Sequence, residues 1–235
     1  MKIVTVPPDP MLPMIRKWKK AIKLPSIALV TGSRGTGKSS LSYWLLEVLS
    51  KEYRIPAYVL GLPEDKWYLL PNTITPLELA ALLKLPEHAM LFFDESAMLF
   101  YARQWQNNVH ALMDVLVSIS RQKRQIILLA THVMRKLDIN IVTDVDCLIF
   151  KEPSELHSRM ERREVRDMTE EAYDEFQKIP SSQRKKYAYV ISHDIKGEML
   201  MNVLPKWWST AISNAFSGIN IAEDRTRQIK KRYSK

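Results

Sequence analysis

Short apolar runs alternate along this chain with longer stretches in which apolar residues recur at helical spacing. Continuous apolar runs predict strands that are buried on both faces, and the periodic stretches predict helices that cover them. The predicted strands are residues 26–31, 55–60, 90–93, 125–131 and 145–150. The predicted helices are residues 38–51, 75–83 and 107–121. This alternation predicts an α/β fold with a central, mostly parallel sheet and helices on both faces.

The two ends of the chain and the region after residue 152 depart from this pattern. The first residues are rich in proline and end in a basic stretch, which predicts an extended arm. After Pro153 the composition becomes charged and predicts a helical insertion at 154–178, then a β-hairpin with strands 187–192 and 198–203, then a closing helix at 207–216. The expected division is an arm (1–25), an α/β core (26–152), a small extension packed on the core (153–216) and a basic, mobile tail (217–235).

Composition narrows the class of protein without identifying it. The chain has 235 residues, of which 46% are hydrophobic and 26% charged, values that predict a folded protein with one large core. No apolar run approaches the roughly 18–20 residues that span a bilayer, so we expect no transmembrane segment. The single cysteine excludes an internal disulfide and a cysteine-based zinc site. A net charge of +9 favours a polyanionic partner such as nucleic acid.

A glycine-rich loop between the first predicted strand and the helix after it is the strongest candidate site. Residues 32–39 read Gly-Ser-Arg-Gly-Thr-Gly-Lys-Ser. Glycines permit the backbone angles that aim several N–H groups at a phosphate, and the start of the following helix also favours anions. In this pattern the lysine reaches the β- and γ-phosphates and the next serine holds Mg²⁺. The predicted nucleotide-binding residues are Gly32, Ser33, Arg34, Gly35, Thr36, Gly37, Lys38, Ser39 and Ser40.

Two acidic residues, Asp94 and Glu95, follow the apolar run at 90–93. A carboxylate at the end of a strand near a P-loop can help hold Mg²⁺, so we expect Asp94 to act with Ser39 as a metal ligand. Glu95 is then placed to polarise the attacking water. Because a hydrolase needs such a group, this pair predicts hydrolysis of the nucleotide and not binding alone.

The strand at 125–131 ends in two polar residues, Thr131 and His132. Either could sense the γ-phosphate or hold the lytic water; the alternative is a helix cap and a packed histidine. Arg121 and Arg124 precede the same strand. They suit an arginine finger supplied to a neighbouring subunit, a DNA contact, or a solvated loop, and the sequence leaves these open.

The order of these motifs resembles the FtsK–HerA superfamily. The resemblance rests on the P-loop, on residues 92–95, on the predicted helix that leads to 121–124, and on 129–132. Within the superfamily the chain looks like the small genome-packaging ATPases of viruses with internal membranes, including archaeal viruses. Residues 144–151 and 204–208 also resemble that group. The likeness covers roughly residues 26–215.

The resemblance implies a RecA-like P-loop NTPase core, ATP and Mg²⁺ as cofactors, and a homo-oligomeric ring, expected to be a hexamer. It implies ATP-driven movement of double-stranded DNA into a preformed capsid, a capsid or virion-membrane protein as partner, and a place in the host cytoplasm or at the virion vertex. By position, it gives Lys38 and Ser39 to the nucleotide and Mg²⁺, Asp94 to Mg²⁺, and Glu95 to water activation. It makes Thr131 or His132 a sensor and Arg121 or Arg124 a finger. Many members carry Gln or Asn at the sensor position, and this chain departs from them with Thr-His.

Four other functions compete with packaging. A zonula-occludens-toxin-like ATPase of phage assembly usually carries a membrane segment after its ATPase domain, and this sequence has none. A plasmid or host ATPase for DNA transfer or processing is an alternative that the sequence leaves open. A P-loop nucleotide or metabolite kinase is disfavoured by Glu95 and the basic charge. A non-enzymatic nucleotide switch would bind without steady turnover.

Overall fold

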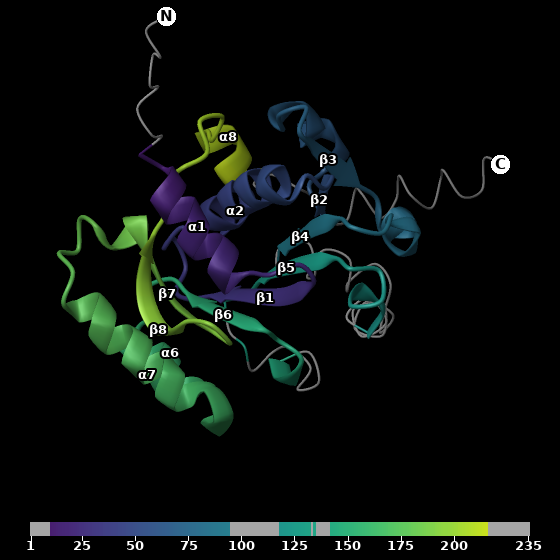
Figure 1. The fold of residues 1–235 in the computed structure, drawn as a ribbon. Coiled ribbons are helices and arrows are strands. Elements are labelled where there is room, and N and C mark those ends of the chain that lie inside the picture. Colours follow the sequence, from purple (N-terminus) through teal and green to yellow (C-terminus); the bar gives the residue numbers. More distant parts are fainter. Residues whose placement is uncertain (1–9, 95–117, 133, 135–141, 216–235) are drawn as a thin grey trace, which may run out of the picture.

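The computed structural model describes residues 10–94, 118–132, 134 and 142–215 of the chain. Its centre is an 8-stranded sheet in the order β3-β2-β4-β5-β1-β6-β7-β8 (Figure 1). The strands from β3 to β6 in this order pair in parallel, and β7 and β8 add an antiparallel edge. The strand bounds are β1 Ser26–Thr31, β2 Ala57–Leu60, β3 Ile74–Leu77, β4 Met90–Asp94, β5 Ile126–Ala130, β6 Cys147–Phe150, β7 Tyr187–Ser192 and β8 Lys196–Met201.

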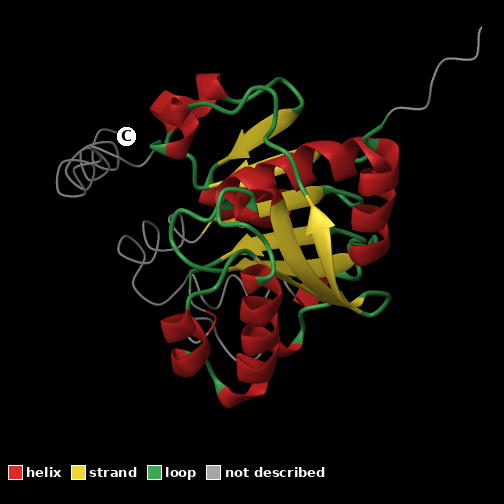
Figure 2. Ribbon diagram, turned by 90° about the vertical axis from the view of Figure 1, so that its left-hand side faces the viewer, coloured by secondary structure: helices red, strands yellow, loops and turns green. Residues whose placement is uncertain are grey.

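Helices cover both faces of this sheet (Figure 2). The described α-helices are α1 Leu12–Ala21, α2 Lys38–Tyr53, α6 Glu155–Met160, α7 Arg163–Gln177 and α8 Thr210–Ser213. Three short 3-10 segments are η1 Glu64–Leu69, η2 Leu79–Lys84 and η4 Arg184–Lys186. The predicted α/β fold is therefore confirmed: a mostly parallel sheet lies between layers of helices.

The central strand β1 joins two hydrophobic cores because its side chains alternate between the faces of the sheet. Ala28 and Val30 pack with α1, α2 and α8 on one face. Ile27 and Leu29 pack with α7 on the other. All six residues of β1 are buried, as its unbroken apolar run predicted.

The prediction of an extended N-terminal arm is wrong for residues 12–21, which form helix α1. Pro13 lies in the first turn of α1, where its missing N–H is harmless. The side chain of Trp18 is fully buried against the edge of Trp44 on α2. The apolar residues of α1 recur at helical spacing, so the signal for this helix was present in the sequence.

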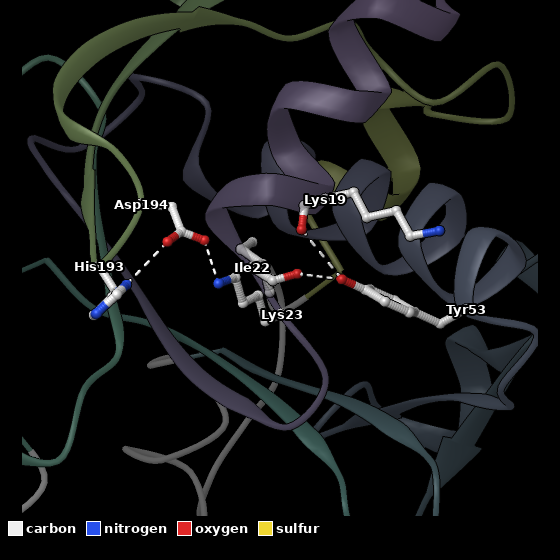
Figure 3. Close-up of polar contacts among 6 residues, drawn as sticks. All are labelled: Lys19, Ile22, Lys23, Tyr53, His193 and Asp194. Carbon is white, nitrogen blue, oxygen red and sulfur yellow. Dashed lines mark hydrogen bonds and ion pairs between the residues drawn. The ribbon is translucent and has the colours of Figure 1, made fainter.

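Two tethers hold the end of α1 (Figure 3). The Tyr53 hydroxyl, at the end of α2, lies 2.8 Å from the Ile22 carbonyl oxygen and 3.2 Å from that of Lys19. Lys23 pairs with Asp194 in the β7–β8 turn, and His193 lies 2.9 Å from the other oxygen of that carboxylate. The two partners hold the pKa of Asp194 down at about 2. The first helix is thereby fixed to both α2 and the hairpin.

Some of the other predicted elements are confirmed and others are wrong. The helix predicted at 75–83 is wrong: β3 occupies the first part and η2 the rest. Pro76 is tolerated in β3 because this edge strand pairs on one side only. The hairpin is confirmed as β7 and β8, whereas the helix predicted at 207–216 shortens to α8. Within the described ranges, no helix is both long and apolar enough to cross a membrane.

Candidate nucleotide-binding site

The sheet brings the predicted motifs to a single edge. β1, β4 and β5 are parallel, so their carboxyl ends lie together. Ala130 near the end of β5 is in register with Val30 on β1 and with Asp94 on β4. The glycine loop, Asp94 and residues 131–132 therefore share this edge, which we call the P-loop edge.

The glycine loop has backbone geometry that only glycine adopts easily. Gly32 has φ 137°, and a Cβ there would lie 2.3 Å from the Lys151 carbonyl oxygen. Gly37, with φ 94°, is the N-cap of α2, so the loop runs directly into the amino end of that helix. A helix N-terminus presents free N–H groups and the positive end of its dipole, which favours a bound phosphate.

Side chains within the loop hold its shape. The Thr36 hydroxyl donates to the Ser33 carbonyl oxygen at 2.8 Å, and the Ser40 hydroxyl donates to that of Gly37 at 3.0 Å. Thr36 and Ser40 are buried, whereas Arg34 and Gly35 are exposed at the outer turn. The predicted binding residues thus divide into an inner set that shapes the loop and an outer pair that faces solvent.

Lys38 joins the loop to the end of β5. Its buried ammonium donates to the carbonyl oxygens of Gly32 at 2.9 Å and Ser33 at 2.8 Å. It also lies 2.7 Å from Nδ1 of His132. An ammonium has no lone pair, so Nδ1 must be the acceptor and the ring proton lies on Nε2. His132 is therefore in direct contact with the P-loop lysine.

Thr131, the other candidate sensor, has a different environment. Thr131 is 1% exposed, and its backbone N–H donates to the Val30 carbonyl oxygen at 2.9 Å. The backbone of Thr131 thus continues the pairing of β5 with β1. Of the two neighbours, the structure brings the side chain of His132 to Lys38.

Ser39, in the first turn of α2, meets Asp94 at the end of β4, although β4 is not adjacent to β1, the strand that leads into the P-loop. β5 lies between β1 and β4, but α2 crosses the sheet toward β4. The Ser39 hydroxyl consequently donates to Oδ2 of Asp94 at 2.7 Å. A hydroxyl and a carboxylate are hard oxygen donors, the set that Mg²⁺ binds alongside water and phosphate. The residues present therefore fit a magnesium ion shared with a nucleotide.

Tyr43 supports this contact from the next turn of α2. Its ring meets Phe92 edge-on at 5.0 Å between centroids, two residues before Asp94 on β4. Burial, with a smaller contribution from the Asp94 charge, raises the pKa of the Tyr43 hydroxyl far above its ordinary value. Trp207 and Trp208 pack on Tyr43 from outside, with Trp207 donating to Glu47 at 2.9 Å. The C-terminal segment thereby supports the face of α2 that carries Ser39.

The predicted finger arginines lie at the opposite edge of the sheet. Both are exposed and precede β5, whose five residues span about 16 Å at the usual rise of a strand. The Arg121 guanidinium is 3.4 Å from Oδ1 of Asp146, and Oδ2 of Asp146 accepts from the Ile27 N–H near the start of β1. Neither arginine is brought to its own P-loop. Glu95, the predicted water activator, lies outside the described residues.

Sequence reasoning missed the segment that backs the P-loop, residues 151–152 after β6. The Lys151 N–H donates to the Thr31 carbonyl oxygen at 2.8 Å, and the Ser33 N–H donates to that of Glu152 at 3.2 Å. A charged residue that directly continues the buried run of β6 was the available signal.

The fold and this edge define the class: the chain has the fold of a RecA-like P-loop NTPase. Comparison with protein-family models gives no match, and neither does comparison with curated protein sequences.

Solved structures with the same fold include viral genome-packaging proteins and a conjugation coupling protein. The genome packaging NTPase B204 from Sulfolobus turreted icosahedral virus 2, in complex with ATP-gammaS, aligns with a TM-score of 0.55 at 14% identity, over 77% of this chain and 98% of that one. The DNA-packaging ATPase B204 from Sulfolobus Turreted Icosahedral Virus gives 0.51 at 12% identity, over 77% and 100%. The pCW3 conjugation coupling protein TcpA gives 0.52 at 13% identity, over 87% and 66%. These are the kinds of protein that the predicted resemblance implies, and at these identities they establish the shared fold.

Proposed function

We propose that this protein is an ATP-hydrolysing motor that moves double-stranded DNA, and that it packages a viral genome into a preformed capsid. One observation carries the enzymatic part: Lys38 contacts both the loop and His132, while Ser39 contacts Asp94, all on one edge of the sheet. A phosphate-binding loop, an oxygen pair for Mg²⁺ and a polar residue on a neighbouring strand are the parts that phosphoryl transfer needs.

Nucleotide binding follows from the loop. Residues 33–37 and the first turn of α2 would surround the phosphates with backbone N–H groups. Lys38 would exchange its contacts with the Gly32 and Ser33 carbonyl oxygens for the β- and γ-phosphate oxygens, which removes the cost of burying its charge. Ser39 and Asp94 would hold Mg²⁺, which neutralises charge on the phosphates.

Hydrolysis of the bound nucleotide would need three further groups: a base for the water, a sensor of the γ-phosphate and an arginine. Glu95 would orient and polarise the attacking water as a general base. His132 would report the γ-phosphate, because its contact with Lys38 would change when Lys38 turns toward that group. An arginine from a neighbouring subunit would stabilise the charge that develops in the transition state, an effect worth about 10³–10⁵ in rate.

The DNA part rests on charge and on shared fold. The net charge of +9 suits a partner with a phosphate backbone. The structural neighbour B204 is described as a genome packaging NTPase, and it shares the fold over nearly its whole length. A ring would also place the distant arginines of one subunit near the P-loop of the next.

A second candidate function is the transfer of DNA between cells, on the same motor chemistry. The observation that favours it is the likeness to the conjugation coupling protein TcpA, which covers 87% of this chain. The two functions differ in the partner that receives the DNA, a capsid or a membrane channel. Co-purification with capsid protein from infected cells supports packaging, and association with a conjugation channel supports transfer.

Steady-state ATP hydrolysis, with and without double-stranded DNA, tests the proposal. We expect turnover that rises with DNA, falls by about 10² or more in Lys38→Ala, and accompanies a ring-sized mass in ATP. Glu95→Gln should bind ATP without steady turnover. Phosphate transfer to a small acceptor with no effect of DNA would indicate a kinase, and binding with no turnover a nucleotide switch.

A further inference from the structure

The side chain of Lys151 is fully buried, which is unusual for a lysine. Its ammonium is satisfied by three oxygens at the P-loop edge. It donates to the carbonyl oxygens of Lys185 at 2.7 Å and Tyr187 at 2.6 Å, and to Oδ1 of Asn202 at 3.0 Å. These acceptors come from η4, from the first residue of β7 and from the residue that follows β8, so one ammonium binds three segments of the C-terminal extension.

The rest of Lys151 lies against the back of the P-loop. Its carbonyl oxygen occupies the space that a side chain at Gly32 would need, and its N–H extends the pairing with β1. Its Cε lies 3.7 Å from where a Cβ of Gly37 would be. Lys151 thus lies beside both the first and the last glycine of the loop.

Glu152 repeats the connection. Its carbonyl oxygen accepts from the Ser33 N–H at 3.2 Å, and its carboxylate pairs with Arg184 of η4 at 2.7 Å. Arg184 is itself fixed by a hydrogen bond to the Ile179 carbonyl oxygen at 2.9 Å. Two consecutive residues therefore join the P-loop backbone to the segment that precedes β7.

We propose that Lys151 is a positioning residue for the phosphate-binding loop: its buried side chain fixes the loop backbone between Gly32 and Gly37 against η4 and β8. This inference rests on the proposed nucleotide-binding function. The ammonium of Lys151 is directed to the C-terminal extension, so Lys151 acts on the site through the direction of the loop N–H groups. Small misplacements of such groups matter, because a shift of about 1 Å can cost 10²-fold in rate.

A purely structural lysine would behave differently from a positioning one. If Lys151 only stabilises the core, its loss lowers the melting temperature and leaves the nucleotide affinity of the folded molecules unchanged. If it positions the loop, the folded molecules themselves bind more weakly. The affinity of molecules shown to be folded separates the two roles.

The experiment compares full-length wild type and Lys151→Met by calorimetric titration with Mg·ADP, at a temperature where circular dichroism shows both folded. We expect the Kd for Mg·ADP to rise about tenfold or more in Lys151→Met, with KM for ATP rising by a similar factor. Ile74→Ala on the far edge strand β3 is the control for lost stability, and its Kd should stay within about twofold of wild type.

Asn202 supplies a second pair of variants should Lys151→Met fail to fold. Asn202→Asp keeps an oxygen for Lys151 and should retain the wild-type Kd within about twofold, whereas Asn202→Leu removes that oxygen and should raise the Kd by about threefold or more. An unchanged Kd in both Lys151→Met and Asn202→Leu overturns the inference while leaving the proposed function intact. Absence of Mg·ADP binding by wild type overturns both.

Discussion

The contact between Lys38 and His132 separates two residues that the sequence could not distinguish. Thr131 and His132 both follow β5, but the imidazole of His132 reaches the P-loop lysine at 2.7 Å, while the backbone of Thr131 pairs with β1. A sensor must change its contacts when the γ-phosphate is present or absent. His132 meets this requirement through the group that would bind that phosphate.

Substitution of the two residues tests this assignment. His132→Ala should lower kcat for ATP by about 10² with a smaller change in KM, because its partner is needed for the reacting γ-phosphate. Thr131→Val, which keeps the volume of the buried side chain, should stay within about tenfold of wild type. Steady-state kinetics on both variants decides between them; the reverse ranking would make Thr131 the sensor.

The burial of Lys151 should also make the free energy of unfolding depend on pH, which is independent of nucleotide binding. Burial lowers its pKa from 10.5 to about 7, with the Glu152 charge opposing the shift. Between these values Lys151 is a neutral amine in the folded chain, where it can donate to only two of its three oxygens, whereas it stays protonated in the unfolded chain, so the free energy of unfolding rises with pH. The slope contributed is at most about 1.4 kcal/mol per pH unit.

Urea denaturation at several pH values from about 7 to 9 measures this contribution. The difference in unfolding free energy between wild type and Lys151→Met should grow in favour of wild type as the pH rises. A difference independent of pH would mean that Lys151 keeps its ordinary pKa in the folded protein.

Among the elements, α1 illustrates how tertiary contacts define a helix at the edge of a domain. Trp18 is buried against α2, and the Tyr53 hydroxyl contacts the carbonyl oxygens at the end of α1. The last carbonyl oxygens of a helix lack partners within it, and here a hydroxyl from another element donates to two oxygens at this end. The helix is therefore part of the core and not a separate arm.

Two substitutions measure how strongly α1 is held. Trp18→Ala should lower the free energy of unfolding by about 3–5 kcal/mol, because it removes a large side chain from the core. Tyr53→Phe should cost about 1 kcal/mol through the lost hydrogen bonds. Tyr58→Phe, at a half-buried tyrosine on β2, is the matched control and should change stability by less than about 0.5 kcal/mol. Equal effects of the two tyrosine substitutions would contradict the role of Tyr53.

The sequence predicted the elements whose signal is local. β1 and β7 have the predicted bounds, and β4 ends in Asp94 as expected, because a continuous apolar run can only be a buried strand or helix. α1 was missed because the prolines near it favoured an extended arm over its periodic apolar residues. β3 was missed because Pro76 is compatible with the first turn of a helix, and residues 75–83 were therefore predicted as helical. In the site, glycine spacing identified the loop, but the backing by Lys151 depends on contacts 34 to 51 residues away in the chain.

At the scale of the whole molecule, the arginines and the P-loop occupy opposite edges of one sheet. The distance of about 16 Å along β5 prevents Arg121 or Arg124 from reaching the phosphates of its own subunit. A finger from this region must therefore act on a neighbouring subunit, which requires a head-to-tail assembly.

Mixed assemblies test this arrangement. Arg124→Ala alone and Glu95→Gln alone should each lose ATP hydrolysis by about 10³. When the two are mixed, some interfaces combine an intact Glu95 with an intact Arg124, so part of the activity should return. The same mixing with Arg121→Ala identifies which arginine acts. No recovery in either mixture would contradict a finger that acts between subunits.

The proposed motor couples ATP hydrolysis at the P-loop edge to movement of double-stranded DNA, and displacement of a third strand from a DNA triplex measures that movement directly. We expect wild type with Mg·ATP to release the third strand from a duplex with a long flanking arm, and Lys38→Ala or Mg·ADP to leave it bound. ATP hydrolysis by wild type without release of the third strand would contradict it.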